Sequence, residues 1–412
     1  MILKRHFGIG KVPLKKCDES VPTVTRSLFL FRHSKMTSDN ETLSAVALSC
    51  INNHCAAVWK RLYGTYGSAT AIIEHRHEVM SMPNGIPSSV AEGLRNVEAA
   101  LDHAHKVMEF GRTHKISTLL LNDADYPLRL AACDDAPLVL FYRGTAQLNQ
   151  AKVISVVGTR ECTAYGKDML RRFIRELHEL CPQVLVVSGL AYGIDVNAHR
   201  YALEEGYDTV GVLAHGLDTI YPASHRQVAA QMVSHGGLLT EYVMGQKIDK
   251  YSFLRGNRIV AGISDATIIV ESRIRGGGMK TVEFAHGYGR RVFAFPGYAG
   301  QACSEGCNSL IHDGRATILL SAESFVKDMG WNVSCESAVS GKSGGEGQLF
   351  QELTDNEYKV ADLLYADNDM TVDAISDACA MSVMDVSCAL FTLEMKGLVR
   401  SMPGNVWHLL DS

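Results

Sequence analysis

Between residues 152 and 295 the sequence alternates short apolar runs with longer segments of helical periodicity. The apolar runs are rich in β-branched residues, and glycine or a polar turn follows each of them; they are residues 153–157, 184–187, 209–213, 266–270 and 292–295. Runs that are apolar throughout predict strands buried on both faces, as in a parallel sheet covered by helices. The sequence therefore predicts an α/β fold with a doubly wound, Rossmann-like sheet, whose ligands bind at the carboxyl ends of the strands.

The remaining sequence divides into segments of different composition. Residues 1–38 form a basic tail without helical periodicity, which we expect to be disordered or to precede a translation start at Met36. Residues 39–110 have the spacing of several short helices, typical of a SAM or helix-hairpin-helix-like domain. We expect the Rossmann-like domain over 111–332 and a Ser/Gly/Glu-rich linker over 333–350.

Residues 351–412 have the pattern of a winged helix. Thr354 and Glu357 have capping-box spacing, Thr371 and Ser382 are expected helix N-caps, and two short strands should follow. With 3 basic and 11 acidic residues the segment has a net charge of −8, which would repel phosphate. The segment is therefore expected to bind a partner other than duplex DNA.

Composition excludes several protein classes. No run approaches the ~18 apolar residues that span a bilayer, so we expect a cytoplasmic protein with no membrane contact. The 11 cysteines are scattered and form no CxxC pair, which favours reduced thiols over disulfides or a zinc site. We expect no metal and no cofactor.

Two glycine turns follow the first two predicted strands. Gly158, Thr159 and Arg160 combine a flexible backbone, a helix start and a cation, which suits an anion, but the full dinucleotide and P-loop fingerprints are absent. Ser188 and Gly189 open the second turn, and the helix after it carries Asp195 and His199 four residues apart. These two side chains are either an acid–base pair or, as we favour, structural groups.

Two further clusters of basic residues lie near the predicted strand ends. The first combines Lys250, Phe253, Asn257 and Arg258, which offer cations for a backbone and an aromatic ring for stacking, as single-stranded nucleic acid requires; the alternative is a core Phe253 and a structural ion pair of Arg258. The second is a glycine-rich helix start with Gly278, Lys280 and Thr281, whose amide groups form a possible anion nest.

Together these motifs resemble the bacterial DNA-processing protein A (DprA, also Smf) family. The resemblance rests on the order and spacing of VVGTRECTAYG, SGLAYGIDVNAH, GLDTIYP, FLRGNRIVAG and FPG. It implies a protein that binds single-stranded DNA, protects it during natural transformation and loads the RecA recombinase onto it, without enzymatic activity. It also implies a homodimer through the Rossmann-like domain and a DNA pocket formed by Arg160, Lys250, Phe253, Asn257 and Arg258.

The sequence departs from that family at residues 276–281. Gly-Gly-Gly-Met-Lys-Thr stands where the family has Ser-Gly-Ser/Ala-Leu-Ile-Thr, so Lys280 replaces an aliphatic residue. The alternative function is a nucleotide phosphoribohydrolase that resembles the Lonely Guy proteins, whose Gly-Gly-x-Gly-Thr-x-x-Glu signature is approached by the segment from Gly276 to Glu283. The fold alone does not distinguish these two functions, because one fold can carry different activities. The chemistry of the site distinguishes them.

Overall fold

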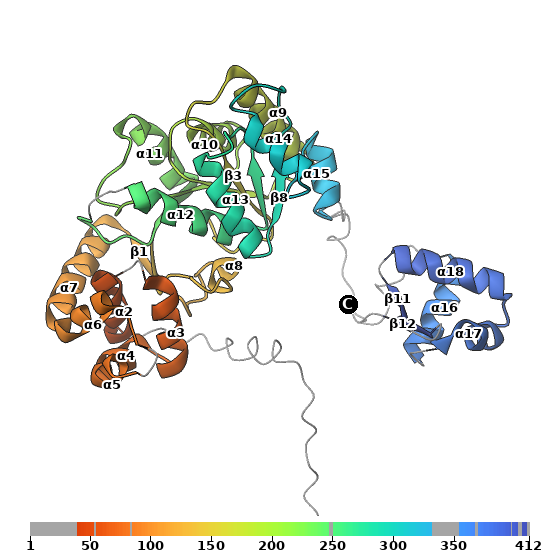
Figure 1. Cartoon of the computed structure of the whole chain (residues 1–412), viewed down its shortest axis with the longest axis horizontal. Helices are drawn as coiled ribbons and strands as arrows, with labels where there is room; N and C mark the ends of the chain where they lie inside the picture. The colour runs from red at the N-terminus through yellow and green to blue at the C-terminus, as the bar shows by residue number, and fades with distance from the viewer. Residues whose placement is uncertain are drawn as a thin grey trace, which may run out of the picture. The chain divides into compact units, whose positions relative to one another are not determined.

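The structure is a computed structural model that describes most of the chain, namely residues 39–52, 55–82, 85–246, 250–331, 354–366, 370–396, 398–402 and 406–409. The expected tail (1–38) and linker (333–350) lie outside these described residues. The chain divides into two compact units, residues 1–333 and 334–412, and each is described separately (Figure 1).

The first unit is built on a nine-stranded sheet in the order β1-β2-β6-β5-β4-β3-β7-β8-β9. The strands β3 to β9 run parallel, while β2 is antiparallel to β6 and β1 to β2. Their bounds are β1 Ser117–Leu120, β2 Val139–Gly144, β3 Val153–Val157, β4 Leu185–Ser188, β5 Thr209–Val212, β6 Gly236–Thr240, β7 Ala266–Ile269, β8 Arg291–Ala294 and β9 Thr317–Ile318. All five predicted strands are confirmed, and the doubly wound α/β fold is confirmed with them.

Helices cover both faces of this sheet (Figure 1), and its central strands are therefore buried on both sides. One hydrophobic cluster joins β3 to α9, α10 and α15, and a second joins the opposite face to α12, α13 and α14. The helix bounds are α8 Leu128–Ala131, α9 Ala164–Leu180, α10 Ile194–Glu204, α11 Arg226–Ser234, α12 Lys250–Gly262, α13 Gly277–Gly287, α14 Glu305–His312 and α15 Ala322–Asp328. The chain crosses from one side of β3 to the other between β6 and β7, so β3 lies at the topological switch point where such sheets bind ligands.

Six helices precede the sheet in the described part of the first unit. They are α2 Asp39–Asn52, α3 Ala56–Tyr66, α4 Ala69–Glu74, α5 Arg76–Met80, α6 Ser88–Arg95 and α7 Val97–His114. Most of their buried apolar residues belong to the same hydrophobic cluster as one face of the sheet. Gly67 ends α3 with a φ of +81°, a left-handed conformation that glycine adopts readily. The separate helical domain expected over 39–110 stays a prediction.

The second unit is a winged helix with its own hydrophobic core. It contains α16 Asp355–Ala366, α17 Val372–Cys379, α18 Val383–Met395 and a three-stranded sheet of β10 Met370–Thr371, β11 Val399–Met402 and β12 Val406–Leu409. The predicted capping box is present, because the Thr354 N–H donates to Glu357 and the Glu357 N–H donates to the Thr354 hydroxyl. Thr371 and Ser382 cap α17 and α18 as predicted.

No single helix in the described residues is long and apolar enough to cross a bilayer, although α17 and residues 383–394 of α18 reach the required length and composition together across a bend of 112°. The same residues contain no cluster of three or more His, Cys, Asp or Glu side chains that would hold a metal ion.

A buried ion pair ties α12 to the end of β6 in the first unit. Arg258 is 6% exposed, and its guanidinium donates to both carboxylate oxygens of Glu241 at 2.7 and 2.6 Å. Asp135 adds a second carboxylate at 3.5 Å. Burial alone lowers the pKa of Arg258, but the Glu241 carboxylate more than offsets this effect and holds that pKa above its ordinary value.

We predict that Arg258→Met lowers the free energy of unfolding by about 3 to 5 kcal/mol, because it leaves the Glu241 carboxylate buried without its partner. Urea denaturation followed by circular dichroism measures this change. The double variant Arg258→Met with Glu241→Leu should recover much of the loss, since neither charge remains. A single variant as stable as the wild type would contradict a structural role for the pair.

Candidate nucleic-acid interface

A pocket of about 280 Å³ opens at the carboxyl ends of the central strands. Turns after β3, β4, β5 and β7 form its walls together with one side of α12. Eight of the residues predicted for the site line it, namely Gly158, Thr159, Arg160, Gly189, Phe253, Asn257, Gly278 and Thr281. The structure therefore brings together residues from four separate sequence motifs.

The turn after β3 is packed closely against the turn after β4. Gly193, which precedes α10, has a φ of +80°, and a Cβ atom there would overlap the backbone of Thr159 and Arg160. The Ile194 N–H donates to the Thr159 carbonyl at 3.1 Å. Glycine at residue 193 is thus required both by conformation and by space.

Glu271 fixes the same turn from the other side. Its carboxylate is buried and accepts hydrogen bonds from the Thr163 N–H at 2.9 Å and the Thr163 hydroxyl at 2.6 Å, at the start of α9. Its carbonyl accepts the Thr159 N–H at 2.7 Å. Because both ends of the segment 159–163 bind Glu271, the backbone that carries Arg160 has a defined position.

The mouth of the pocket carries a cation and two aromatic rings. The Arg160 guanidinium lies over the Phe253 ring, 5.1 Å from its centroid, and Arg160 is exposed. Tyr221 approaches Phe253 edge-on, with 6.0 Å between the ring centroids, and is also exposed. A guanidinium and aromatic faces in one opening suit a phosphate next to an unstacked base.

The start of α13 forms a further part of the wall. Its N-cap is Gly276, which has no side chain to cap the helix, and Gly277 and Gly278 line the pocket with their backbone. Asn257 on α12 reaches across and donates its side-chain amide to the Gly277 carbonyl at 3.4 Å. The positive end of the helix dipole and its first amide groups therefore favour an anion in this part of the pocket.

Asp195 is a titratable group within the pocket. It lies in the first turn of α10. Desolvation raises the pKa of its carboxyl group to about 7, although the Ala191 N–H, the nearby Arg160 and the Ser188 hydroxyl act in the opposite direction. Near neutral pH this carboxyl group therefore changes its charge where an anion would bind.

His199 does not form an acid–base pair with Asp195. The imidazole is fully buried, and its Nε2 donates to the Gly189 carbonyl at 2.5 Å. Its Nδ1 lies 2.7 Å from the Thr209 hydroxyl, and burial lowers the pKa of the ring to about 4. These contacts support the structural interpretation of His199.

Three of the predicted site residues lie outside the pocket lining. Ser188 is buried and donates to the Val156 carbonyl at 2.6 Å. Arg258 forms the ion pair with Glu241 described above, so the alternative of a structural ion pair is correct for this residue. Lys280 is exposed and pairs with Glu283 on the outer side of α13 at 2.7 Å. Of Lys250 the structure describes the backbone in α12 and not the side chain.

Three pocket residues that carry charge or an aromatic ring, Tyr221, Asp195 and Arg273, were not predicted as site residues from the sequence. Tyr221 lies in the GLDTIYP turn, and Asp195 precedes His199 by four residues, a spacing that suggested only an acid–base pair or a structural role. Arg273, which follows β7 and lines the pocket, adds a second exposed cation. The signal in the sequence that could have identified Tyr221 is its position as an aromatic residue in a turn after a predicted strand.

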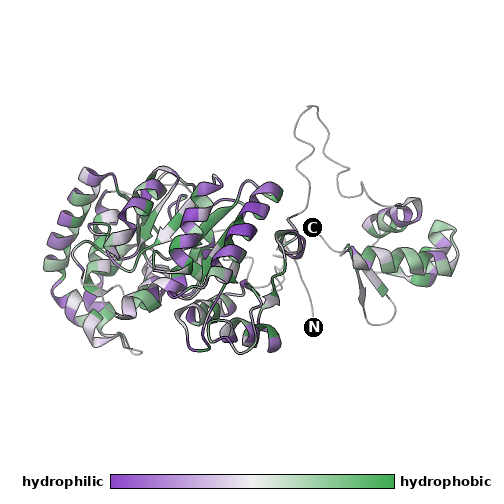
Figure 2. Cartoon of the chain, turned by 90° about the horizontal axis from the view of Figure 1, so that it is seen from above, coloured by the Kyte–Doolittle hydropathy of each residue, from purple (hydrophilic) through white to green (hydrophobic). Residues whose placement is uncertain are grey.

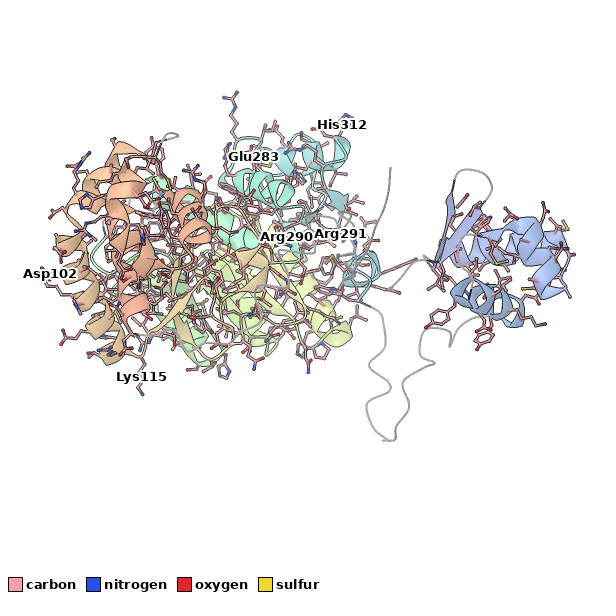
Figure 3. The ribbon with its side chains drawn as sticks, turned by 90° about the horizontal axis from the view of Figure 1, so that it is seen from below. Asp102, Lys115, Glu283, Arg290, Arg291 and His312 are labelled. Atoms are coloured by element: carbon pink, nitrogen blue, oxygen red, sulfur yellow. The ribbon has the colours of Figure 1, made fainter. Side chains whose placement is uncertain are left out.

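The carboxylate that the hydrolase alternative requires is not in the pocket. Glu283 is about half exposed, does not line the pocket and bonds to Lys280. Figure 3 shows it on α13 at the outside of the first unit. The geometry therefore gives no support to the Lonely Guy-like signature.

Comparison with known proteins agrees with the fold and with the order of the motifs. The family model described as DNA recombination-mediator protein A matches residues 117–330, and the DprA winged helix domain matches residues 348–405. DNA processing protein DprA of Streptococcus pneumoniae is 36% identical over 52% of this chain and 74% of that protein. Protein Smf of Escherichia coli is 32% identical over 69% of this chain and 75% of that protein.

A solved structure gives the same result. The X-ray structure of DNA processing protein A from Streptococcus pneumoniae superposes with a TM-score of 0.60 at 30% sequence identity, over 71% of this chain and 99% of that chain. Because the first family model alone spans more than half of the sequence, the chain belongs to the DNA recombination-mediator protein A (DprA/Smf) family.

Proposed function

We propose that this protein binds single-stranded DNA in the pocket at the ends of β3, β4, β5 and β7. The observation that carries the proposal is the Arg160 guanidinium on the Phe253 ring, with Tyr221 at its edge, above a wall of glycine amides. Phosphate needs the cation and the amides, and an unstacked base needs the aromatic faces. A duplex would keep its bases stacked and would not use the aromatic faces.

We further propose that the bound strand is passed to the RecA recombinase, so that the protein acts as a recombination mediator without catalysing a reaction. The description of the family as recombination mediators supports this role. Natural transformation is the process that the family resemblance favours, and a protein that loads RecA would act in the cytoplasm. A homodimer through the Rossmann-like domain would join two pockets into one longer track.

A salt titration of oligonucleotide binding tests the proposed site. Wild-type protein should bind a single-stranded oligonucleotide more tightly than the same sequence as a duplex, with an affinity that falls steeply as salt rises. Arg160→Ala should weaken binding and reduce the slope of log K against log salt by about 0.7 for each lost phosphate contact. The exposed Arg171→Ala on α9 is the matched control and should change neither quantity.

Unchanged affinity and slope in a folded Arg160→Ala variant would contradict the proposed pocket. From sequence alone we expect the same loss for Lys250→Ala.

Incubation with nucleoside monophosphates tests the hydrolase alternative. Release of free base at a rate that substitutions in the pocket lower would favour that alternative.

We predict that Phe253→Leu lowers single-strand affinity about five-fold or more, equivalent to ~1 kcal/mol, because leucine keeps the apolar bulk and removes the ring on which Arg160 and a base stack. Phe253 is half-buried, so the melting temperature should stay close to that of the wild type. Fluorescence anisotropy and thermal unfolding measure the two effects. A loss of stability with unchanged affinity would make Phe253 a core residue instead.

We predict that single-strand affinity decreases as pH rises through about 7, because Asp195 becomes negatively charged beside the bound phosphate. The bound anion favours the protonated carboxyl group; if it raises that pKa by about one unit, affinity changes about ten-fold across the transition. Asp195→Asn should bind equally at pH 6 and pH 8. The proposal would fail on this point if that variant kept the full pH dependence.

We predict that removal of residues 351–412 leaves most of the single-strand affinity intact, because the pocket lies entirely in the first unit and the removed segment has a net charge of −8. The truncated protein should stay within about three-fold of the wild type, since like charge contributes no phosphate contact. Anisotropy titration measures this, with circular dichroism to confirm folding. Loss of nearly all affinity in a folded truncated protein would contradict the expectation.

A further inference from the structure

The third helix of the winged helix, α18, is apolar on both of its sides. Figure 2 colours most of it as hydrophobic. One side packs into the core of the second unit through Val386, Ala389, Leu390 and Leu393, which are all buried. On the outer side Met384 is 77% exposed and Phe391 is 63% exposed, and Cys388 between them is exposed as well.

These three residues share one face of the helix. At about 100° per residue, Met384, Cys388 and Phe391 fall within a sector of roughly 60°, opposite to the buried residues. Asp385 in the first turn and Glu394 in the last turn lie on the two sides of this sector. We call the face formed by Met384, Cys388 and Phe391 the α18 outer face.

Large exposed apolar side chains in a row are unusual on a surface that has no partner. A helix that is apolar all round is normally buried, and a contiguous exposed apolar strip marks an interaction site. The neighbouring hydroxyl groups do not make this strip polar, because Ser387 donates to the Val383 carbonyl and Thr392 donates to the Cys388 carbonyl of the same helix.

Charge identifies the kind of partner. Residues 351–412 have a net charge of −8, and on α18 Asp385 and Glu394 border the outer face. Of the few cations, Lys396 is paired with Glu357 at 2.8 Å. A phosphate backbone or a second copy of this acidic unit would be repelled, whereas a positively charged partner would be attracted.

We propose that the α18 outer face binds an amphipathic helix of a partner protein. The apolar residues of that helix would recur at i, i+3 or i+4, and i+7, which is the spacing of Met384, Cys388 and Phe391, and would pack against them. Lysine and arginine on the flanks of the partner helix would face Asp385 and Glu394. This surface lies in the second unit, so the proposal does not depend on DNA binding in the first unit.

Binding of a fluorescent model peptide to the full-length protein tests this proposal. The probe is an 18-residue amphipathic helix of leucine and lysine, and the matched probe has glutamate in place of lysine. Wild-type protein should bind the lysine peptide and not the glutamate peptide, and the affinity should fall between about 0.05 M and 0.5 M salt.

The double variant Met384→Asp with Phe391→Asp separates apolar packing from simple charge attraction. It removes the apolar anchors while adding negative charge, so packing predicts at least a ten-fold loss of affinity for the lysine peptide. Both side chains are exposed, so the unit should remain folded, and Phe391→Ser serves as a milder second variant with a smaller loss. Leu128→Asp, an exposed leucine in the first unit, is the matched control and should bind as the wild type does.

Equal or tighter binding by the double aspartate variant would overturn the proposal, because charge alone would then explain the binding. Equal binding of the glutamate peptide would overturn it as well. Loss of duplex DNA binding in the same variant, or loss of concentration-dependent self-association in sedimentation, would assign the face to DNA or to a second copy instead.

Discussion

The buried side chain of Glu271 holds together the parts of the first unit that form the pocket. Glu271 follows β7. Its carboxylate accepts hydrogen bonds from Thr163 at the start of α9, and its backbone carbonyl accepts the Thr159 N–H in the turn after β3. The turn after β4 then packs on the turn after β3 at Gly193. Arg160 projects from this assembly toward Phe253, so the position of its cation depends on contacts within the protein.

The sequence predicted the central sheet because its strands are buried on both faces and therefore uniformly apolar. The edge strands β1 and β9 and the glycine-led β6 lack that signature, and none of them was predicted as a strand. Strand β2 was not predicted either, although its first four residues are apolar and buried. Site residues next to a strand end were predicted well, since any side chain or glycine there must lie at the sheet edge. Site residues on helices were predicted less well, because the side chains of neighbouring residues in a helix point about 100° apart.

That angle explains the predictions that the structure does not bring to the pocket. Asn257 lines it while the adjacent Arg258 turns toward Glu241, and Thr281 lines it while Lys280 points outward. No pattern in the local sequence tells which residue of each pair faces the ligand. Tyr221 reaches the pocket only because the turn after β5 folds over α12, which is a tertiary contact.

The two units separate two kinds of surface chemistry. The first combines exposed arginines, aromatic rings and helix amides in a concave site, which suits a polyanion with unstacked bases. The second is acidic and exposes an apolar helix face, which suits a cationic protein helix. The two proposed functions, binding of single-stranded DNA by the first unit and of a protein helix by the second, therefore use different surface chemistry.

Photo-crosslinking tests the central claim most directly, namely that a single strand of DNA binds in the pocket whose mouth carries Arg160 and Phe253. An oligonucleotide with 5-iodouracil at successive positions is irradiated in complex with the full-length protein, and the crosslinked peptides are mapped by mass spectrometry. The account predicts crosslinks to Phe253 or Tyr221, the two aromatic rings at the mouth of the pocket. Crosslinks confined to residues 39–110 or 351–412, with none at these two rings, would contradict it.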